Sequence, residues 1–461
     1  MSARYPLPAA RHPIADRFLA DGAAVEEAIE RFGSPLHVVF PQVMAENAAA
    51  LTHVLRRHAV PHEVFYAHKV NASTALVAEA AAAGLGVDVA SSAELDRALA
   101  AGFAPHRIEA TGPKSPAFVE RIASLGVTAN ADDLWELDRL AAAAPSGQPS
   151  GSNVQVLLRL SGFASPMVPH SRFGIDLADA DAALETVRRA PGLELRGVAF
   201  HLDTADPAAR VDALTESMAV VAAAYRKGLR PSVVDIGGGL RQRFVEDPEP
   251  FQRYAQALAA GPGELVWPGH DVVAPAAHKY GNHRPATEVL ERFLTAEIER
   301  RPVAEVLREC MLTLWIEPGK ALVDHAGITL ASVLYRKRAA GRDLVVLDLS
   351  RNQVTPADQE VLVDPVVVDG RGDPPEKGVF LAGRLCLESD LISRRKVFLD
   401  AEPDSGDVLA FVNTAAYQMD LSASAAAGHP PPPKVAAVLD GGRFTFTAET
   451  PADTFDDHHG S

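Results

Sequence analysis

The stretch "FYAHKVNASTALVAEAAAAGLGVDVASSAELDRALAAG" (residues 65–102) decides the fold, because two short apolar runs in it are each followed by an alanine-rich segment with helical periodicity. Similar apolar runs recur from about Gly33 to "SVVDIGGG" (232–239), with helical segments between several of them. Continuous apolar strands that alternate with helices are typical of a parallel sheet covered on both faces. About eight such units predict an α/β fold, a (β/α)8 TIM barrel, rather than an open sheet.

The pattern changes after about Asp324, where short β-rich pieces are separated by Gly, Pro and Asp. This change predicts an appended all-β, barrel-like domain over residues 326–461. The barrel is then expected at 34–325. Residues from about 241 to 314 fit neither pattern, so we expect an insertion there, near the barrel mouth.

Composition narrows the class of protein. The formal net charge of −16 argues against nucleic acid or an anionic membrane as a partner, since both would repel the chain. Cys310 and Cys386 are the two cysteines, and their separation matches neither a disulfide framework nor a metal-binding knuckle. The N-terminal residues do not look like a signal peptide, and no apolar run is long enough to span a bilayer. We therefore expect a cytoplasmic protein with reduced thiols.

Polar groups stand at the ends of several predicted strands, where barrel enzymes carry their chemistry. They are Lys69, Asp88, Arg159, His201 and the glycines of "DIGGGL" (235–240). Successive glycines let backbone N–H groups approach a phosphate closely, although a glycine turn alone is as often structural. The run "IEPGKALV" (316–323) places Glu317 after another strand, and alone it would indicate a salt-bridged surface turn.

Taken together, these groups suggest pyridoxal 5'-phosphate as cofactor. That cofactor needs a lysine to hold its aldehyde as a Schiff base, a backbone cradle for its phosphate, and a carboxylate beside its ring nitrogen. Lys69, the glycines and Glu317 supply one candidate for each.

Ten motifs in order along the chain strengthen this interpretation. They are "FYAHKVN", "GVDVASSAEL", "GPKS", "LLRLS", "SRFGI", "FHLDT", "DIGGGL", "IEPGKALV", "GRLCLESD" and "NTAAYQMD". With them the chain resembles the fold-type III pyridoxal-phosphate-dependent decarboxylases, the diaminopimelate and ornithine decarboxylase-like family, and within it the Y4yA-like branch. The resemblance implies an alanine-racemase-like barrel, a β domain that includes residues 1–33, and a homodimer with shared active sites.

The resemblance also implies roles for single residues. The catalytic groups would be Lys69, Cys386 and Glu317. The cofactor would contact Lys69, Asp88, Arg159, His201, Thr204, Gly237, Gly238, Gly239, Glu317, Gly319, Lys320 and Tyr417. The substrate would contact Lys320, Cys386, Leu387, Glu388 and Asp390. Each residue taken alone has a structural alternative, such as a snorkelling lysine or a satisfied core histidine.

The implied reaction is decarboxylation of an amino acid through a Lys69 Schiff base and a quinonoid intermediate, with Cys386 or Lys69 returning a proton to Cα. Four departures from the family bear on the substrate. Lys320 stands where relatives mostly have arginine, and Asp203-Thr204 where they have Gly-Ser. Leu387 follows the cysteine where an acidic residue is usual, with Glu388 one place later. The Arg-Pro…Tyr pattern of diaminopimelate enzymes is absent from "LDLSRNQVTPADQEVLVDP" (347–365).

These departures argue against diaminopimelate and indicate a non-standard amino-acid substrate, either free or tethered to a carrier. Two other functions stay open, a pyridoxal-phosphate-dependent racemase or epimerase and a non-catalytic decarboxylase-like binding protein. No metal is expected, because the spacing of His270, His278 and His283 matches no regular ligand pattern.

Overall fold

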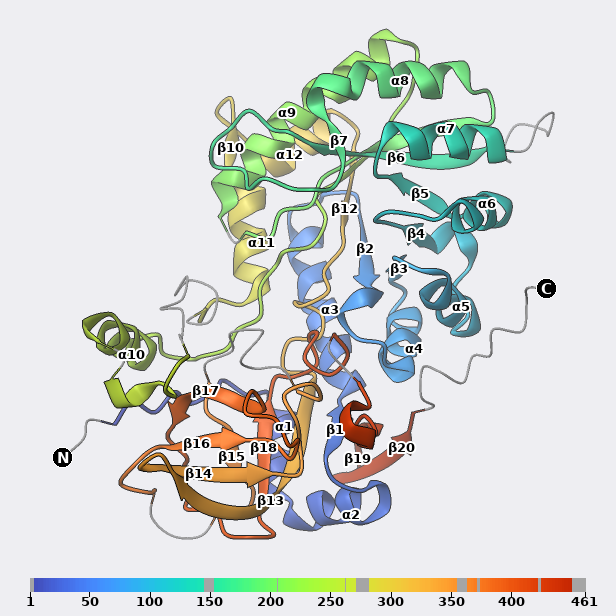
Figure 1. The fold of residues 1–461 in the computed structure, drawn as a ribbon. Helices are drawn as coiled ribbons and strands as arrows, with labels where there is room; N and C mark the ends of the chain where they lie inside the picture. Colours follow the sequence, from blue (N-terminus) through green and yellow to red (C-terminus); the bar gives the residue numbers. More distant parts are fainter. Residues whose placement is uncertain are drawn as a thin grey trace. The chain divides into compact units, whose positions relative to one another are not determined.

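The computed structural model describes residues 4–144, 153–204, 206–261, 263–270, 282–354, 363–370, 374–421 and 424–449. The chain forms two compact units, shown in Figure 1. The barrel unit comprises residues 45–241 and 286–322, and the β unit comprises 1–44, 242–285 and 323–461.

In the described part of the barrel unit, eight parallel strands form a closed ring. They are β2 (His62–Ala67), β3 (Gly86–Val89), β4 (Ile108–Ala110), β5 (Thr128–Ala131), β6 (Val154–Ser161), β8 (Leu193–Ala199), β9 (Val233–Asp235) and β12 (Thr313–Ile316). The ring closes because β12 pairs with both β2 and β9, and β5 pairs with β6. A short strand, β7 (Ile175–Asp176), adds to the end of β6. The predicted TIM barrel is confirmed.

Helices follow most barrel strands and lie outside them (Figure 1). They are α4 (Thr74–Ala82), α5 (Ser92–Ala100), α6 (Pro116–Leu125), α7 (Leu134–Ala143), α8 (Ala180–Arg189), α9 (Pro207–Arg226), α11 (Ala286–Thr295) and α12 (Val303–Glu309), with α3 (Pro41–Arg57) before β2. The side chains of Ser73, Ser91, Ser115 and Asp133 each accept a hydrogen bond from the first turn of the following helix. These caps start each helix shortly after a strand ends.

Short elements complete the barrel unit. Three single-turn 3-10 helices are η1 (His68–Val70), η2 (Pro105–Arg107) and η3 (Leu177–Asp179), and a small hairpin joins β10 (Glu297–Ile298) to β11 (Arg301–Pro302). The η1 turn matters most, because it directly follows β2 and carries Lys69.

A mixed sheet builds the β unit. Its strands are β1 (Leu36–Val39), β13 (Gly327–Ala339), β14 (Arg342–Leu347), β15 (Val366–Val367), β16 (Val379–Ala382), β17 (Leu391–Val397), β18 (Val408–Val412), β19 (Lys434–Asp440) and β20 (Arg443–Ala448). Val333, Val345, Leu347, Leu381 and Ile392 are among the side chains that form its core. The appended β domain predicted from the sequence is confirmed.

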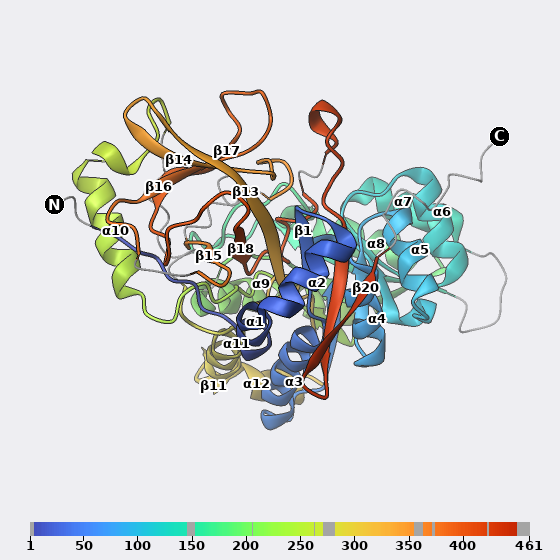
Figure 2. The same cartoon turned by 90° about the horizontal axis from the view of Figure 1, so that it is seen from below.

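This unit also contains helices that the strand pattern does not predict. They are α1 (Pro13–Ala20), α2 (Gly22–Phe32) and α10 (Glu249–Ala260), together with the single turns η4 (Gly263–Leu265) and η5 (Ala426–Gly428). Helix α1 lies beside β20 in Figure 2. The ring of Phe18 on α1 contacts those of Phe444 and Phe446 in the β19–β20 hairpin. The amphipathic α1 and α2 therefore cover part of the sheet.

Two segments differ from the pattern read in the sequence. The run "PLHVVF" (35–40) falls within the range 34–325 predicted for the barrel, but its strand β1 pairs with β13 and β19 in the β unit. The run is apolar in either setting, so its composition does not encode its partner strands. The described part of 241–314 divides, since 242–285 belongs to the β unit and 286–322 to the barrel unit. No described helix is long and apolar enough to cross a membrane.

Candidate active site

Lys69 stands at the carboxyl end of the barrel strands. Its Nζ donates a hydrogen bond to Asp88 Oδ2 at 3.2 Å, and Asp88 is buried at the end of β3. The lysine side chain itself is 35% exposed. Register explains the pairing, because Ala67 at the end of β2 lies opposite Asp88. The structure therefore holds a partly exposed amine against a buried carboxyl group at the ends of neighbouring barrel strands.

Asp88 is not an ordinary ionised aspartate. Its burial raises the pKa to about 7, although the nearby Lys69 ammonium opposes the shift. Asp88 Oδ1 accepts no hydrogen bond from the described residues. Asp88 can therefore gain or lose a proton near neutral pH.

The glycine run after β9 is required by the backbone around it. Gly237 and Gly239 have positive φ angles of 65° and 74°, which favour glycine. A Cβ on Gly238 would lie 2.5 Å from the carbonyl oxygen of Glu317, and one on Gly239 would overlap the carbonyl oxygen of Leu202. The loop thus brings together the chain ends of β8, β9 and β12.

Not all three glycine N–H groups are available for a phosphate. Gly237 N–H donates to Asp235 Oδ1 at 2.7 Å, and Gly238 N–H donates to His201 Nδ1 at 3.1 Å. Among the described residues, Gly239 N–H has no acceptor. Gly239 is therefore the member of the run that can still donate to an anion.

The bond from Gly238 also fixes the state of His201. Its Nδ1 accepts a hydrogen bond, so the neutral ring carries its proton on Nε2. Burial, Lys69 and Arg159 lower the pKa of His201 to about 3. His201 is consequently a neutral aromatic ring beside the glycine loop.

Arg210 was missed in the sequence, yet it holds the loop together. This buried side chain on α9 donates to four backbone carbonyls, those of Leu202, Thr204, Ile236 and Gly238, at 2.7 to 3.1 Å. Burial lowers its pKa to about 10, which leaves the guanidinium charged at neutral pH. One signal was available in the sequence, because Arg210 lies on the helix stripe formed by the buried Ala213, Leu214 and Ser217.

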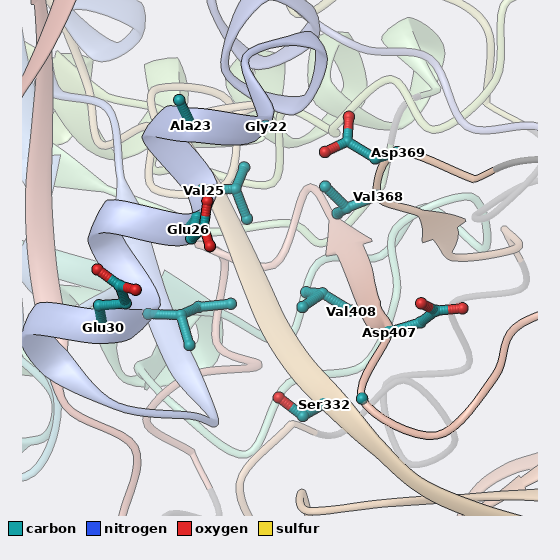
Figure 3. A pocket seen from close by; sticks show the side chains of 12 residues that line it. Gly22, Ala23, Val25, Glu26, Glu30, Ser332, Val368, Asp369, Asp407 and Val408 are labelled. Carbon is teal, nitrogen blue, oxygen red and sulfur yellow. The ribbon is translucent and has the colours of Figure 1, made fainter.

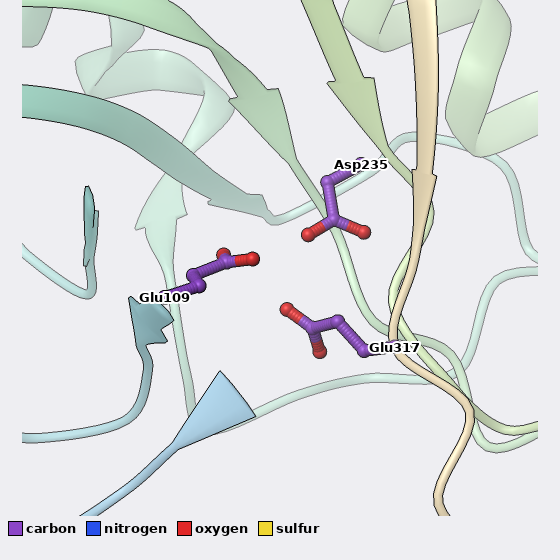
Figure 4. Close-up of side chains that lie close together, drawn as sticks. All are labelled: Glu109, Asp235 and Glu317. Carbon is purple, nitrogen blue, oxygen red and sulfur yellow. The ribbon is translucent and has the colours of Figure 1, made fainter. Parts of the chain in front are cut away.

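Three buried carboxyl groups converge inside the barrel. Glu109, Asp235 and Glu317 place oxygens within 4.8 Å of one another, and Figure 4 shows the groups pointing toward each other. Burial raises the pKa of Asp235 to about 6 and that of Glu317 to about 8, and the neighbouring carboxyl group of Asp235 adds to the shift for Glu317. Glu109 and Asp235 were not predicted, although each interrupts an apolar strand.

The remaining barrel residues of the predicted site lie around this centre. Arg159 Nη1 is 3.6 Å from Asp132 Oδ1, and its guanidinium lies over the ring of Phe173. Lys320 Nζ donates to Asp203 Oδ1 at 3.3 Å, so Asp203 is a paired, half-exposed residue.

Two smaller residues shape the loops. The hydroxyl of Thr204 accepts a hydrogen bond from the backbone N–H of Asp206. A Cβ on Gly319 would lie 3.1 Å from the Cβ of Val70, so the "EPG" turn packs on the turn that carries Lys69.

Five predicted site residues belong to the β unit. Cys386, Leu387 and Glu388 are exposed, with Leu387 at 61%. Asp390 is buried, and its two carboxylate oxygens accept from the N–H groups of Arg351 and Leu385. Tyr417 sits in a turn with a positive φ of 65°. Asp390 therefore shapes the loop that presents Cys386.

Other features of the described chain bear less on a site. An open pocket of about 550 Å³ in the β unit is lined by α2 and by Asp369 and Asp407 (Figure 3), and it contains none of the predicted site residues. Among the histidines considered for a metal, His278 lies outside the described residues.

The geometry fits pyridoxal phosphate. The cofactor would find a reachable amine, an open glycine N–H, a neutral ring and a buried carboxyl group of raised pKa, each at a strand end of one barrel. Each of Asp88, Glu109 and Asp235 has one buried oxygen (Oδ1, Oε2 and Oδ2, respectively) that accepts no hydrogen bond from the described residues. Such unsatisfied acceptors are expected where a ligand completes the site.

Comparisons with known proteins show the family of the chain. The sequence family described as "Pyridoxal-dependent decarboxylase, pyridoxal binding domain" matches residues 44–273. The chain is 34% identical over 459 residues to the uncharacterized protein y4yA of Sinorhizobium fredii, covering 96% of both chains. It is 26% identical to the diaminopimelate decarboxylase of Pseudomonas aeruginosa, covering 88% of both. The structure of diaminopimelate decarboxylase from M. jannaschii with L-lysine superposes with a TM-score of 0.73 at 20% identity, over 93% of this chain and 92% of that one.

Proposed function

The chain belongs to the pyridoxal-dependent decarboxylases of the diaminopimelate and ornithine type, and from this premise we propose that it is an enzyme that decarboxylates an amino acid with pyridoxal 5'-phosphate bound at Lys69. The observation that carries the proposal is the Lys69–Asp88 pair, a partly exposed amine 3.2 Å from a buried carboxyl oxygen at the barrel mouth.

Several groups would hold the cofactor. Lys69 would bind its aldehyde, Glu317 its ring nitrogen, and the neutral ring of His201 would stack on it. Gly239 N–H and the side chain of Lys320 would contact its phosphate. When bound, the cofactor supplies an electron sink for the pair left on Cα after CO₂ departs.

The chain's own residues manage protons around that reaction. Lys69 must lose a proton before its amine can act as a nucleophile, and Asp88, with a pKa of about 7, is placed to take one. Glu317, with a pKa of about 8, brings a proton to the position of the ring nitrogen. Cys386 is the proposed acid that returns a proton to Cα, supplied by the partner in a homodimer.

The proposed substrate is a non-standard amino acid. Leu387 follows Cys386 and is exposed, so an apolar group stands where an amine-reading carboxylate is usual in the family. Glu388 is also exposed, and it is the nearest acidic side chain in the loop sequence. A side chain without a distal ammonium group therefore fits this loop better than a diamine-type substrate.

The test uses the purified full-length chain with added pyridoxal phosphate. We expect an absorption band from lysine-bound cofactor, and release of CO₂ and an amine from one of a set of pooled amino acids. Lys69→Ala is the matched control and should show neither. Deuterium exchange at Cα without CO₂ release would favour a racemase or epimerase instead. Absence of any band in the wild-type protein would favour a non-catalytic binding protein.

A further inference from the structure

Glu109 is a fully buried acid without a cation. It lies in the middle of β4 and is 0% exposed. Its Oε1 accepts a hydrogen bond from Asn130 Nδ2 at 2.8 Å, while its Oε2 has no partner among the described residues. No lysine or arginine of the described chain forms an ion pair with it. A buried carboxylate in this setting would be strongly destabilised.

The surroundings of Glu109 are mainly acidic. The titratable groups nearest to it on the facing elements are Asp88, Asp235 and Glu317, and Asp88 lies directly opposite it in the β3–β4 register. The cations that act on those neighbours are Lys69 and Arg159, and His201 is neutral. Four carboxyl groups face two cations in a low-dielectric interior, so they cannot all be ionised.

Glu109 is the member of the group that loses most by ionising. Asp235 Oδ1 accepts a hydrogen bond from the N–H of Gly237, and Asp88 accepts one from the amine of Lys69. Glu109 has the amide of Asn130 beside it and no cation among the described residues. Burial and the three neighbouring carboxyls together raise its pKa well above the ordinary value for glutamate.

We propose that Glu109 is a positioning residue that stays protonated and shares the proton on its unpartnered oxygen with Glu317 and Asp235. In this role it stabilises Glu317 as an anion whenever a cationic ring nitrogen lies beside it. The proton of Glu317 moves to that nitrogen, one O–H bond breaks and one N–H bond forms, and Glu109 keeps its own proton. That the ring belongs to pyridoxal phosphate rests on the proposed function, whereas the proton retained by Glu109 does not depend on it.

Glutamine distinguishes this role from others, because it copies a protonated glutamate in shape and can still donate. Glu109→Gln should therefore bind pyridoxal phosphate within about threefold of wild type, and Glu109→Val should bind it at least about tenfold more weakly. Binding of the analogue with carbon in place of the ring nitrogen should not differ between the two variants. Asp348→Asn is the control, since it removes another buried acid of raised pKa, in the β unit.

A second measurement needs no cofactor. If Glu109 holds its proton in the folded protein but loses it on unfolding, stability falls as the pH rises above about 4.5. The folding equilibrium constant then changes by up to about tenfold per pH unit. Urea unfolding should show this fall in wild type, and Glu109→Gln should reduce its slope.

The two measurements separate the possible failures. Weak binding by Glu109→Gln, or a slope unchanged from wild type, would overturn the proposal. Equal losses by Glu109→Val for cofactor and analogue would show a purely structural role and would also overturn it. If wild type bound no pyridoxal phosphate, the proposed function would fail, while the slope would still decide whether Glu109 holds its proton.

Discussion

Replacing Arg210 with methionine should lower the free energy of unfolding of the barrel unit by about 4 kcal/mol. The buried guanidinium is the donor for four backbone carbonyls, on the loops after β8 and β9. Methionine fills much of the same volume, but it donates no hydrogen bond. The substitution therefore removes donors without opening a large cavity.

The magnitude follows from the acceptors left behind. Each buried carbonyl that loses its donor costs about 1 kcal/mol, so four of them cost about 4 kcal/mol. The carbonyl of Thr204 is only partly buried and can recover water, which reduces the cost. Removing the buried guanidinium also removes the free-energy cost of keeping its charge away from water, which reduces the loss of stability further. Loosening of the glycine loop increases that loss. A range of about 3–5 kcal/mol results.

Urea unfolding followed by tryptophan fluorescence measures this change. The chain has three tryptophans, and in a Trp267→Phe background the remaining two, Trp135 and Trp315, both lie in the barrel unit. The signal then reports the barrel alone. Arg226→Met is a matched control, because Arg226 is exposed on the same helix and should change stability by less than about 0.5 kcal/mol.

A loss below about 1 kcal/mol for Arg210→Met would refute the reasoning, since the carbonyls would then have other partners. Arg210→Lys should fall between wild type and Arg210→Met, because an ammonium keeps the charge but not the fork of donors. If the lysine variant were as unstable as the methionine variant, charge would have no part in holding the loop.

Lys69→Ala should abolish the absorption band of covalently bound cofactor, and an unchanged band in its spectrum would exclude Lys69 as the attachment point. Asp203→Ser should tighten cofactor binding by up to about fivefold in an equilibrium titration, because it removes an exposed ion pair between Lys320 and Asp203 that is worth at most about 1 kcal/mol; weaker binding would argue against this. Incubation with EDTA should leave the band and CO₂ release unchanged, and a loss reversed by a divalent cation would contradict it. The cofactor-free protein should lose stability as pH rises from about 4 to about 8, because the folded-state pKa values of Asp88 and Glu317 are raised to about 7 and about 8. Urea midpoints across that range test this, and a flat profile would refute it.

The barrel could be predicted from sequence because its signal is local. Each strand and its helix lie within about 25 residues in a region such as 65–102, and the serine caps mark where the helices begin. Strand β1 was assigned to the wrong sheet for the opposite reason. Its partners begin about 290 and 400 residues later, and an apolar run of four residues carries no information about them.

The residues of the candidate site also divide into those that a local sequence pattern predicts and those that it does not. Lys69 and Glu317 belong to motifs that can be recognised in a short window. Glu109 and Asp235 are single charged residues in short apolar strands, and Arg210 is one of several charged residues of α9. What these three residues do depends on closure of the ring. Closure brings β4, β9 and β12 together, and only then do three separate acids become one buried cluster. The burial of a charge is a tertiary property that a linear pattern shows only as an interruption.

The charges near the glycine loop change how the departures from the family should be understood. Asp203 and Lys320 form one ion pair, so the lysine that replaces an arginine contributes little net positive charge there. Arg210 keeps its charge with a pKa of about 10 and donates to the carbonyl of Gly238 at 2.7 Å, directly behind the loop. The positive charge near a bound phosphate would then come mainly from Arg210, whose hydrogen bonds also hold the glycine loop together. Asp203 and Lys320 amount to a single compensated change beside the glycine loop. Leu387 and the missing Arg-Pro…Tyr pattern are then the departures that bear on the substrate.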